Sequence, residues 1–232
     1  MFDARPMLAD LATRITAMER PQLRGGGAPA LPVSPALAPL LPGGLRRGST
    51  VAVTGSVSLV LATVGEASAA GAWCALVGMP TISAEAAHDF GIVLERFPLV
   101  PSPGRSWAEV VGALLDAVDI VVAQVPARLA DGDIRRLAAR VRTRDAVFVP
   151  FAPDRHQWPH AEVRLEIEPG CWAGIGEGSG RLCRREVTVT AAGRAQRARA
   201  RSATLWLPAA DGGVQSSVAL TPAPVVLMLA GR

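Results

Sequence analysis

Residues 48–67, GSTVAVTGSVSLVLATVGEA, have the layout of a strand, a turn that begins with glycine, and a helix. A phosphate-binding loop has this layout and needs the spacing G-x-x-x-x-G-K-[ST], in which backbone N–H groups and the lysine hold phosphates and the hydroxyl holds Mg²⁺. Counting from Gly55, the second glycine falls on Val60, the lysine on Leu61 and the hydroxyl on Ala62. The sequence therefore predicts the scaffold of a nucleotide site without the groups that bind a nucleotide.

The carboxylates that such a site requires are also replaced. The metal-binding aspartate at the end of the third predicted buried strand falls on Ala123, or on Gln124 if the register slips by one residue. The catalytic glutamate falls near Met79 or Pro80. Because phosphoryl transfer depends mainly on positioned charge, we expect no catalytic residues, no ATPase activity and no cofactor.

Two histidines, His156 and His160, stand four residues apart, but Pro159 between them prevents a regular helix. No cysteine or carboxylate completes a ligand set around them, so we expect no metal site.

The basic residues are all arginine, 24 in number, and lysine is absent from the chain. The net charge of +4 slightly favours an acidic partner, although an ordinary arginine-rich surface explains it equally well. One basic segment lies between two predicted strands. It could contact the phosphates of DNA or form a solvated hairpin loop, and its members are Arg194, Arg197, Arg199 and Arg201.

The elements that must position these residues alternate along residues 51–151. The patterns predict strands at 51–54, 73–77, 119–125 and 146–151, helices at 58–70, 83–90, 106–117 and 131–142, and extended chain at 94–100. Ser83 is expected to cap its helix, and Ser106 with Glu109 has the spacing of a capping box. Strands that are apolar on both faces and alternate with helices predict an α/β fold with a mostly parallel sheet between two helical layers.

The pattern changes to alternating apolar and charged residues after residue 161. Segments 163–167, 182–190 and 203–207 are therefore expected to be antiparallel strands that extend the edge of the sheet.

The ends of the chain are predicted to lie outside this core. Residues 6–20 form a helix with one apolar stripe, made by Leu8, Leu11, Ile15 and Met18. A proline- and glycine-rich linker at 23–44 separates this N-terminal helix, residues 1–22, from the core at 45–208, and residues 209–232 form a C-terminal tail. Because an isolated helix cannot bury its own stripe, we expect the stripe to dock on the body, on another copy or on a partner.

The compartment is expected to be the cytoplasm. The three cysteines are widely spaced and suggest no disulfide framework. The first residues have no apolar signal segment, and no uncharged stretch reads as a membrane span.

Several separate segments together resemble the RecA ATPase core. They are residues 41–78, which begin LPGGLRRGST; VDIVVAQVP at 118–126; and AEVRL…AAGR and ATLWLP between 161 and 208. The resemblance implies a RecA-like fold over roughly residues 41–208. RecA-type recombinases also carry two long DNA-binding loops, whose places here hold only residues 126–145 and 152–160, so we expect no recombinase filament.

A RecA-like core without nucleotide chemistry, preceded by a helix on a linker, resembles the ImuA-type accessory proteins of the bacterial mutasome, in the actinobacterial ImuA-prime form. The resemblance implies a non-enzymatic scaffold for translesion synthesis in the SOS response. Its partners would be an ImuB-like inactive Y-family polymerase and an error-prone DnaE-type polymerase, with self-association through the N-terminal helix. The alternatives are an arginine-mediated DNA-binding protein, a SulA-like inhibitor of cell division, and a cryptic ATPase.

Overall fold

A computed structural model describes residues 29–152, 158–159, 161–175, 180–193 and 200–217. Within these residues one ten-stranded sheet runs in the order β10-β9-β8-β6-β1-β5-β4-β2-β3, with β7 paired to β8 beside this path. The strands are β1 (Val51–Thr54), β2 (Cys74–Val77), β3 (Leu99–Val100), β4 (Ile120–Gln124), β5 (Val147–Ala152), β6 (Val163–Ile167), β7 (Cys171–Ile175), β8 (Gly180–Ala192), β9 (Arg201–Trp206) and β10 (Gln215–Ser216).

The helices are α2 (Val57–Ala69), α3 (Ala84–Asp89), α4 (Trp107–Ala117) and α5 (Asp131–Arg144), with short 3-10 turns at Leu94–Arg96 and Gly104–Ser106. Helices α2 and α3 contribute to one apolar core cluster, and α4 and α5 to another on the opposite face of the sheet. Among the described residues no helix is long and apolar enough to cross a membrane.

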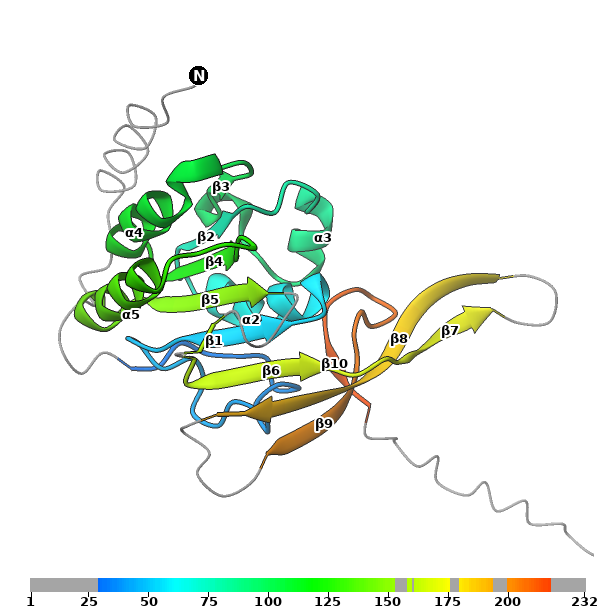
Figure 1. The fold of residues 1–232 in the computed structure, drawn as a ribbon. Helices are drawn as coiled ribbons and strands as arrows, with labels where there is room; N and C mark the ends of the chain where they lie inside the picture. The colour runs from blue at the N-terminus through cyan, green and yellow to red at the C-terminus, as the bar shows by residue number, and fades with distance from the viewer. Residues whose placement is uncertain (1–28, 153–157, 160, 176–179, 194–199, 218–232) are drawn as a thin grey trace, which may run out of the picture.

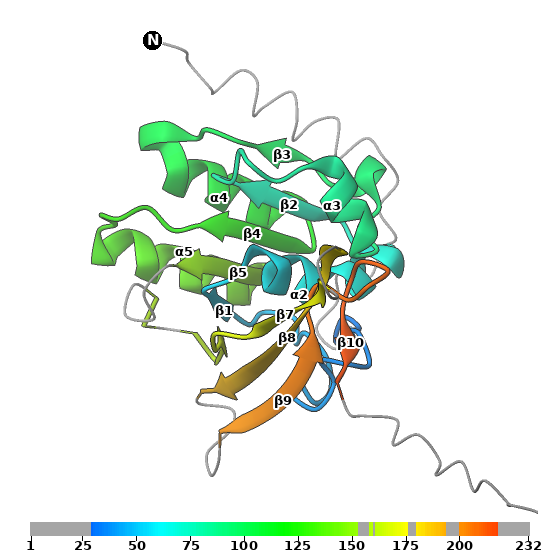
Figure 2. The ribbon, with the colours of Figure 1, turned by 90° about the vertical axis from the view of Figure 1, so that its right-hand side faces the viewer.

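The half of the sheet from β3 to β6 is parallel, and Figure 2 shows β3, β2, β4, β5 and β1 following one another in that order. Every residue of β2 and four of the five in β4 are buried, as expected for strands covered on both faces. Beyond β6, strands β7 to β10 are antiparallel. The α/β fold with a mostly parallel sheet and antiparallel edge strands is therefore confirmed.

Helix α2 lies against the chain that ends α3. A Cβ on Gly65 would come within 1.9 Å of the carbonyl oxygen of Phe90. Ser68 of the same helix accepts a hydrogen bond at 3.0 Å from the backbone nitrogen of Val93. The glycine is needed for this close approach, which fixes α2 over the sheet.

A part-buried ion pair joins the chain before β1 to the starts of two parallel strands. Asp119 accepts a hydrogen bond from Nη1 of Arg47 at 2.9 Å and, through its other oxygen, one from the backbone nitrogen of Trp73 at 3.0 Å. The side chains of Arg47 and Asp119 are only 12% and 24% exposed, so the pair is partly protected from water.

The predicted linker differs from the structure in its second half. Residues 29–45 are folded: a bridge between Leu31 and Leu45 closes the segment on itself, and its leucines are buried. The physical reason is that one face of β6, β8 and β9 is apolar, and these leucines cover it. The segment and the strands share one core cluster, whose members here include Leu31, Leu37, Leu40, Leu41 and Leu45 from the segment and Leu165, Val187, Val189 and Leu205 from the strands.

The predicted tail also differs, because its first residues belong to the sheet. Ala209 is buried, and Gln215–Ser216 pair with β9 as β10. Pairing satisfies backbone groups that a free tail would leave to water. The stretch predicted to be extended is strand only at Leu99–Val100, because its start forms a 3-10 turn.

Of the two predicted caps, one is confirmed. The Ser83 hydroxyl accepts a hydrogen bond from the Ala86 nitrogen at 3.0 Å and caps α3. Ser106 makes no cap bond, because a 3-10 turn runs directly into α4 there.

Candidate functional site

The junction between β1 and α2 occupies the place of a phosphate-binding loop. Strand β1 ends at Thr54, and only Gly55 and Ser56 separate it from the start of α2 at Val57. Ser56 caps the helix by accepting a hydrogen bond at 3.4 Å from the Leu59 nitrogen. A connection of two residues has no loop that could surround a phosphate group.

Gly55 has a local structural role in this connection. Its φ of 87° lies in the left-handed region that favours glycine. A Cβ there would also come within 2.9 Å of Cγ2 of Ile167, at the end of β6. The glycine therefore permits both the sharp turn into α2 and the close packing of the neighbouring strand.

The three motif positions that follow lie inside the helix and in the core. Val60, Leu61 and Ala62 are 0%, 3% and 2% exposed and belong to the core cluster under α2. The next residue, Thr63, donates its hydroxyl hydrogen bond to the Leu59 carbonyl at 2.7 Å. Because these residues are buried in the helix, their backbone and side chains are not accessible to a nucleotide.

The place of the metal-binding aspartate is equally apolar. Ala123 is fully buried in the core cluster under α4 and α5. Gln124 is exposed at the end of β4 and pairs with Phe151. Met79 is buried and Pro80 is exposed, so no carboxylate follows β2. The carboxyl ends of the parallel strands thus carry no ionisable side chain at any of these motif positions.

Most of the other predicted site residues lie outside the described part of the chain. These are Leu8, Leu11, Ile15 and Met18 of the N-terminal stripe and Arg194, Arg197 and Arg199 of the basic segment. The two histidines at which no metal site was expected, His156 and His160, also lie outside it. Arg201 is described: it is exposed at the start of β9. It lines a cavity of about 180 Å³ together with Leu40, Leu41 and the ion pair between Arg46 and Glu162.

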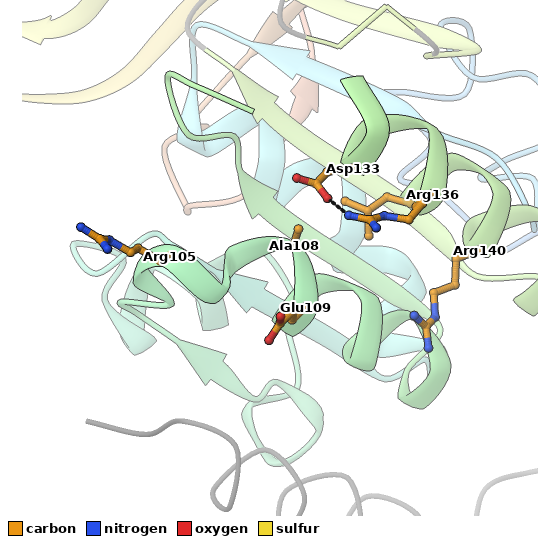
Figure 3. A pocket seen from close by; sticks show the side chains of 7 residues that line it. Arg105, Ala108, Glu109, Asp133, Arg136 and Arg140 are labelled. Atoms are coloured by element: carbon orange, nitrogen blue, oxygen red, sulfur yellow. Dashed lines mark hydrogen bonds and ion pairs between the residues drawn. The ribbon is translucent and has the colours of Figure 1, made fainter. Parts of the chain in front are cut away.

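A charged groove between α4 and α5 was not predicted as a site. It has a volume of about 400 Å³, and Ala108 and Leu137 lie in it among charged side chains. Figure 3 shows these side chains, which are Arg105, Glu109, Asp133, Arg136 and Arg140. The clustered arginines of the α5 sequence are the signal that could have found it.

The charges around this groove are largely matched. Arg140 donates to both oxygens of Asp116, from Nε at 2.8 Å and from Nη2 at 2.5 Å, and Arg144 contacts the same carboxylate at 3.0 Å. The hydrogen bond from Arg140 is the main reason that the pKa of Asp116 lies below its ordinary value. Arg136 pairs with Asp133 one turn earlier on α5. The pairs to Asp116 fasten α4 to α5, and all of these pairs leave the groove without a strong net charge.

The sequence reasoning also missed the exposed apolar side chains of β7 and β8. Trp172, Ile175 and Leu182 are 49%, 65% and 46% exposed. No regular alternation marks Cys171–Ile175 as a strand, and glycine residues stand within and beside this segment.

Comparisons with known proteins identify the family and the fold. A family model described as MT3502 N-terminal domain matches residues 39–160. The uncharacterized protein Rv3395c of Mycobacterium tuberculosis is 30% identical over 166 residues, which are 68% of this chain and 80% of that protein. A crystal structure of the RadB recombinase superposes with a TM-score of 0.56 at 15% identity, covering 78% of this chain and 96% of RadB. At that identity the likeness to RadB establishes a RecA-like fold alone.

Proposed function

The chain belongs to the family described as MT3502 N-terminal domain, and for this chain we propose a non-catalytic function as a RecA-like accessory protein in the repair of damaged DNA. The observation that carries the proposal is the start of α2 at Val57. A helix that begins there replaces the phosphate-binding loop and turns Leu61 and Ala62 into core residues. Residues at such a site contribute to packing, and the fold can still present surfaces to other proteins.

The pathway and partners come from the resemblance to ImuA-type proteins. We propose that the protein acts in the cytoplasm during the SOS response and binds an ImuB-like inactive Y-family polymerase. An error-prone DnaE-type polymerase would join the same assembly. The apolar stripe of the N-terminal helix is the proposed surface for self-association.

Calorimetric titration with Mg·ATP tests the non-catalytic half of the proposal. We expect no saturable heat up to about 1 mM nucleotide, because the groups that hold phosphate and Mg²⁺ are replaced. A dissociation constant above about 1 mM corresponds to a binding free energy of less than about 4 kcal/mol. An affinity in the micromolar range would overturn it.

Reconstitution tests the partner. The purified chain is mixed with the purified ImuB-like protein from the same genome, in nuclease-treated buffer, and the mixture is examined by size-exclusion chromatography with light scattering. A complex of defined stoichiometry is the expected result. Separate elution of both proteins at micromolar concentration would contradict the scaffold role.

A further inference from the structure

Strand β7 and the facing part of β8 form an arm that extends beyond the helices (Figure 1). The arm is defined here as residues 171–175 and 180–186. Its two strands are antiparallel, with Trp172 opposite Arg185 and Ala173 opposite Arg184. Because directly opposed residues share a face, Trp172 and Arg185 lie on one face of the arm and Arg184 on the other.

The arm carries much of the exposed apolar surface of the described residues. Five large apolar side chains in the described ranges are more than a third exposed, and three of them, Trp172, Ile175 and Leu182, are on the arm. Single exposed apolar residues are ordinary, but a local concentration of them marks an interaction site.

One edge of the arm is open. Among the described strands β7 pairs only with β8, so its outer edge offers unpaired backbone groups. Natural edge strands are usually blunted by proline, by charge, by a β-bulge or by a covering segment. Cys171–Ile175 contains no proline and no charged residue. Its register shifts only between Ala173 and Ile175, so the regular edge at Cys171–Ala173 is suited to accept an additional strand.

The charge of the arm specifies the partner. The arm has three basic side chains, Arg181, Arg184 and Arg185, and only one acidic side chain, Glu186. The Glu186 carboxylate already accepts a hydrogen bond from the Ser217 hydroxyl. Two guanidinium groups rest on indole rings: Cζ of Arg184 lies 4.3 Å from the Trp206 ring centroid and Cζ of Arg185 lies 6.0 Å from that of Trp172. Stacking orients a guanidinium group while leaving its N–H donors able to bind a carboxylate.

We propose that the arm binds an extended segment of another protein, in which apolar and acidic residues alternate, as an added strand on the outer edge of β7. Backbone pairing to β7 supplies affinity, apolar contact with Trp172 and Ile175 fixes the register, and the arginines select acidic side chains. A second copy of the arm is disfavoured, because it would bring three further arginines to the same place. A nucleic acid is disfavoured because two of the three exposed apolar residues are aliphatic and offer no surface for base stacking.

The inference goes beyond the proposed function and does not depend on the identity of the partner there. It is tested with the full chain and a fluorescein-labelled peptide of about ten residues in which glutamate and isoleucine alternate, the length of a strand and its flanks. Two matched peptides serve as controls. In the first, lysine replaces every glutamate; in the second, the backbone nitrogens of the isoleucines carry N-methyl groups. Fluorescence anisotropy is measured for the wild type, Trp172→Ala and Arg181→Glu. Leu99→Ser is the control, since Leu99 is 50% exposed on β3 at the other edge of the sheet.

Binding of the glutamate peptide should be at least tenfold tighter than that of either matched peptide. It should weaken at least tenfold in Trp172→Ala and Arg181→Glu, and stay unchanged in Leu99→Ser. Arg181→Glu changes an exposed side chain, so it keeps the fold and isolates the charge. Each of four results would overturn the inference: equal binding of all three peptides, no binding of any peptide, displacement of the glutamate peptide by oligothymidine, or a dimer that disappears in the arm variants.

Discussion

Placing a lysine at position 61 tests whether the start of α2 is the reason that nucleotide chemistry is absent. In a phosphate-binding loop that lysine faces the ligand, so Leu61→Lys would restore part of a site. In this structure Leu61 is 3% exposed inside a helix that begins four residues earlier. The substitution should therefore place an amine in the core.

The expected cost follows from this burial. Loss of a buried leucine removes about 1.5–3 kcal/mol of transfer free energy. A buried lysine with a pKa near 5–6 must also lose its proton at pH 7, and because the ordinary lysine pKa is about 10.4, this costs about 4–5 kcal/mol more. Together these predict a loss of about 6–8 kcal/mol, which is comparable with the whole stability of many domains.

The assay is urea unfolding followed by circular dichroism, with calorimetric titration of Mg·ATP on the same samples. Glu66→Lys is the matched control, because Glu66 is exposed on the same helix. Its free energy of unfolding should differ from that of the wild type by no more than about 0.5 kcal/mol. Leu61→Lys should be strongly destabilised, or unfolded without urea, and should bind no nucleotide. Wild-type stability of this variant, or nucleotide binding by it, would refute the assignment of residue 61 to the core.

Three further predictions concern other groups. Asp119→Ala should lower the free energy of unfolding by about 2–4 kcal/mol, because it leaves the guanidinium group of Arg47 and a backbone N–H without their acceptor; a change like that of removing the exposed Glu66 carboxylate would contradict it. Because the pKa of Asp116 is lowered in the folded state, its stabilisation is full above about pH 4 and is lost as the pH falls through the lowered pKa. Carboxyl NMR titration of Arg140→Ala should therefore show that pKa rise toward its ordinary value, and an unchanged titration would count against the pairing. Burial raises the pKa of the Cys74 thiol to about 12, so Ellman's reagent should label exposed Cys171 quickly in the native protein and reach Cys74 only in denaturant; fast labelling of all thiols would be inconsistent with the core.

The parallel half of the fold could be predicted because its signals are local. Short, fully apolar strands such as Cys74–Val77 alternate with helices that carry their own apolar faces. That pattern fixes both the element types and their burial. The resemblance to RecA-like segments then indicates a RecA-like core over roughly residues 41–208, whereas the order of the strands comes from the structure.

The rest depends on contacts between distant residues. Proline and glycine suggested a linker before residue 45, although Leu37 and Leu40 were a signal of burial that only the apolar face of the antiparallel strands explains. Strand β7 exists because β8 pairs with it, so its own residues predict little. Counting motif positions located Leu61, and the helix predicted from residue 58 begins one residue earlier, at Val57.

The segment at 29–45 has a consequence for how the protein folds during synthesis. It leaves the ribosome before any strand of the sheet, yet it shares a core with Leu205 and Leu207, made more than 150 residues later. At about 5–20 residues per second, its leucines remain without their final partners for roughly 10–30 s. Contacts of such long sequence separation also slow folding in general. The nascent chain thus presents an apolar segment throughout translation, and a chaperone that binds short leucine-rich stretches would act there first.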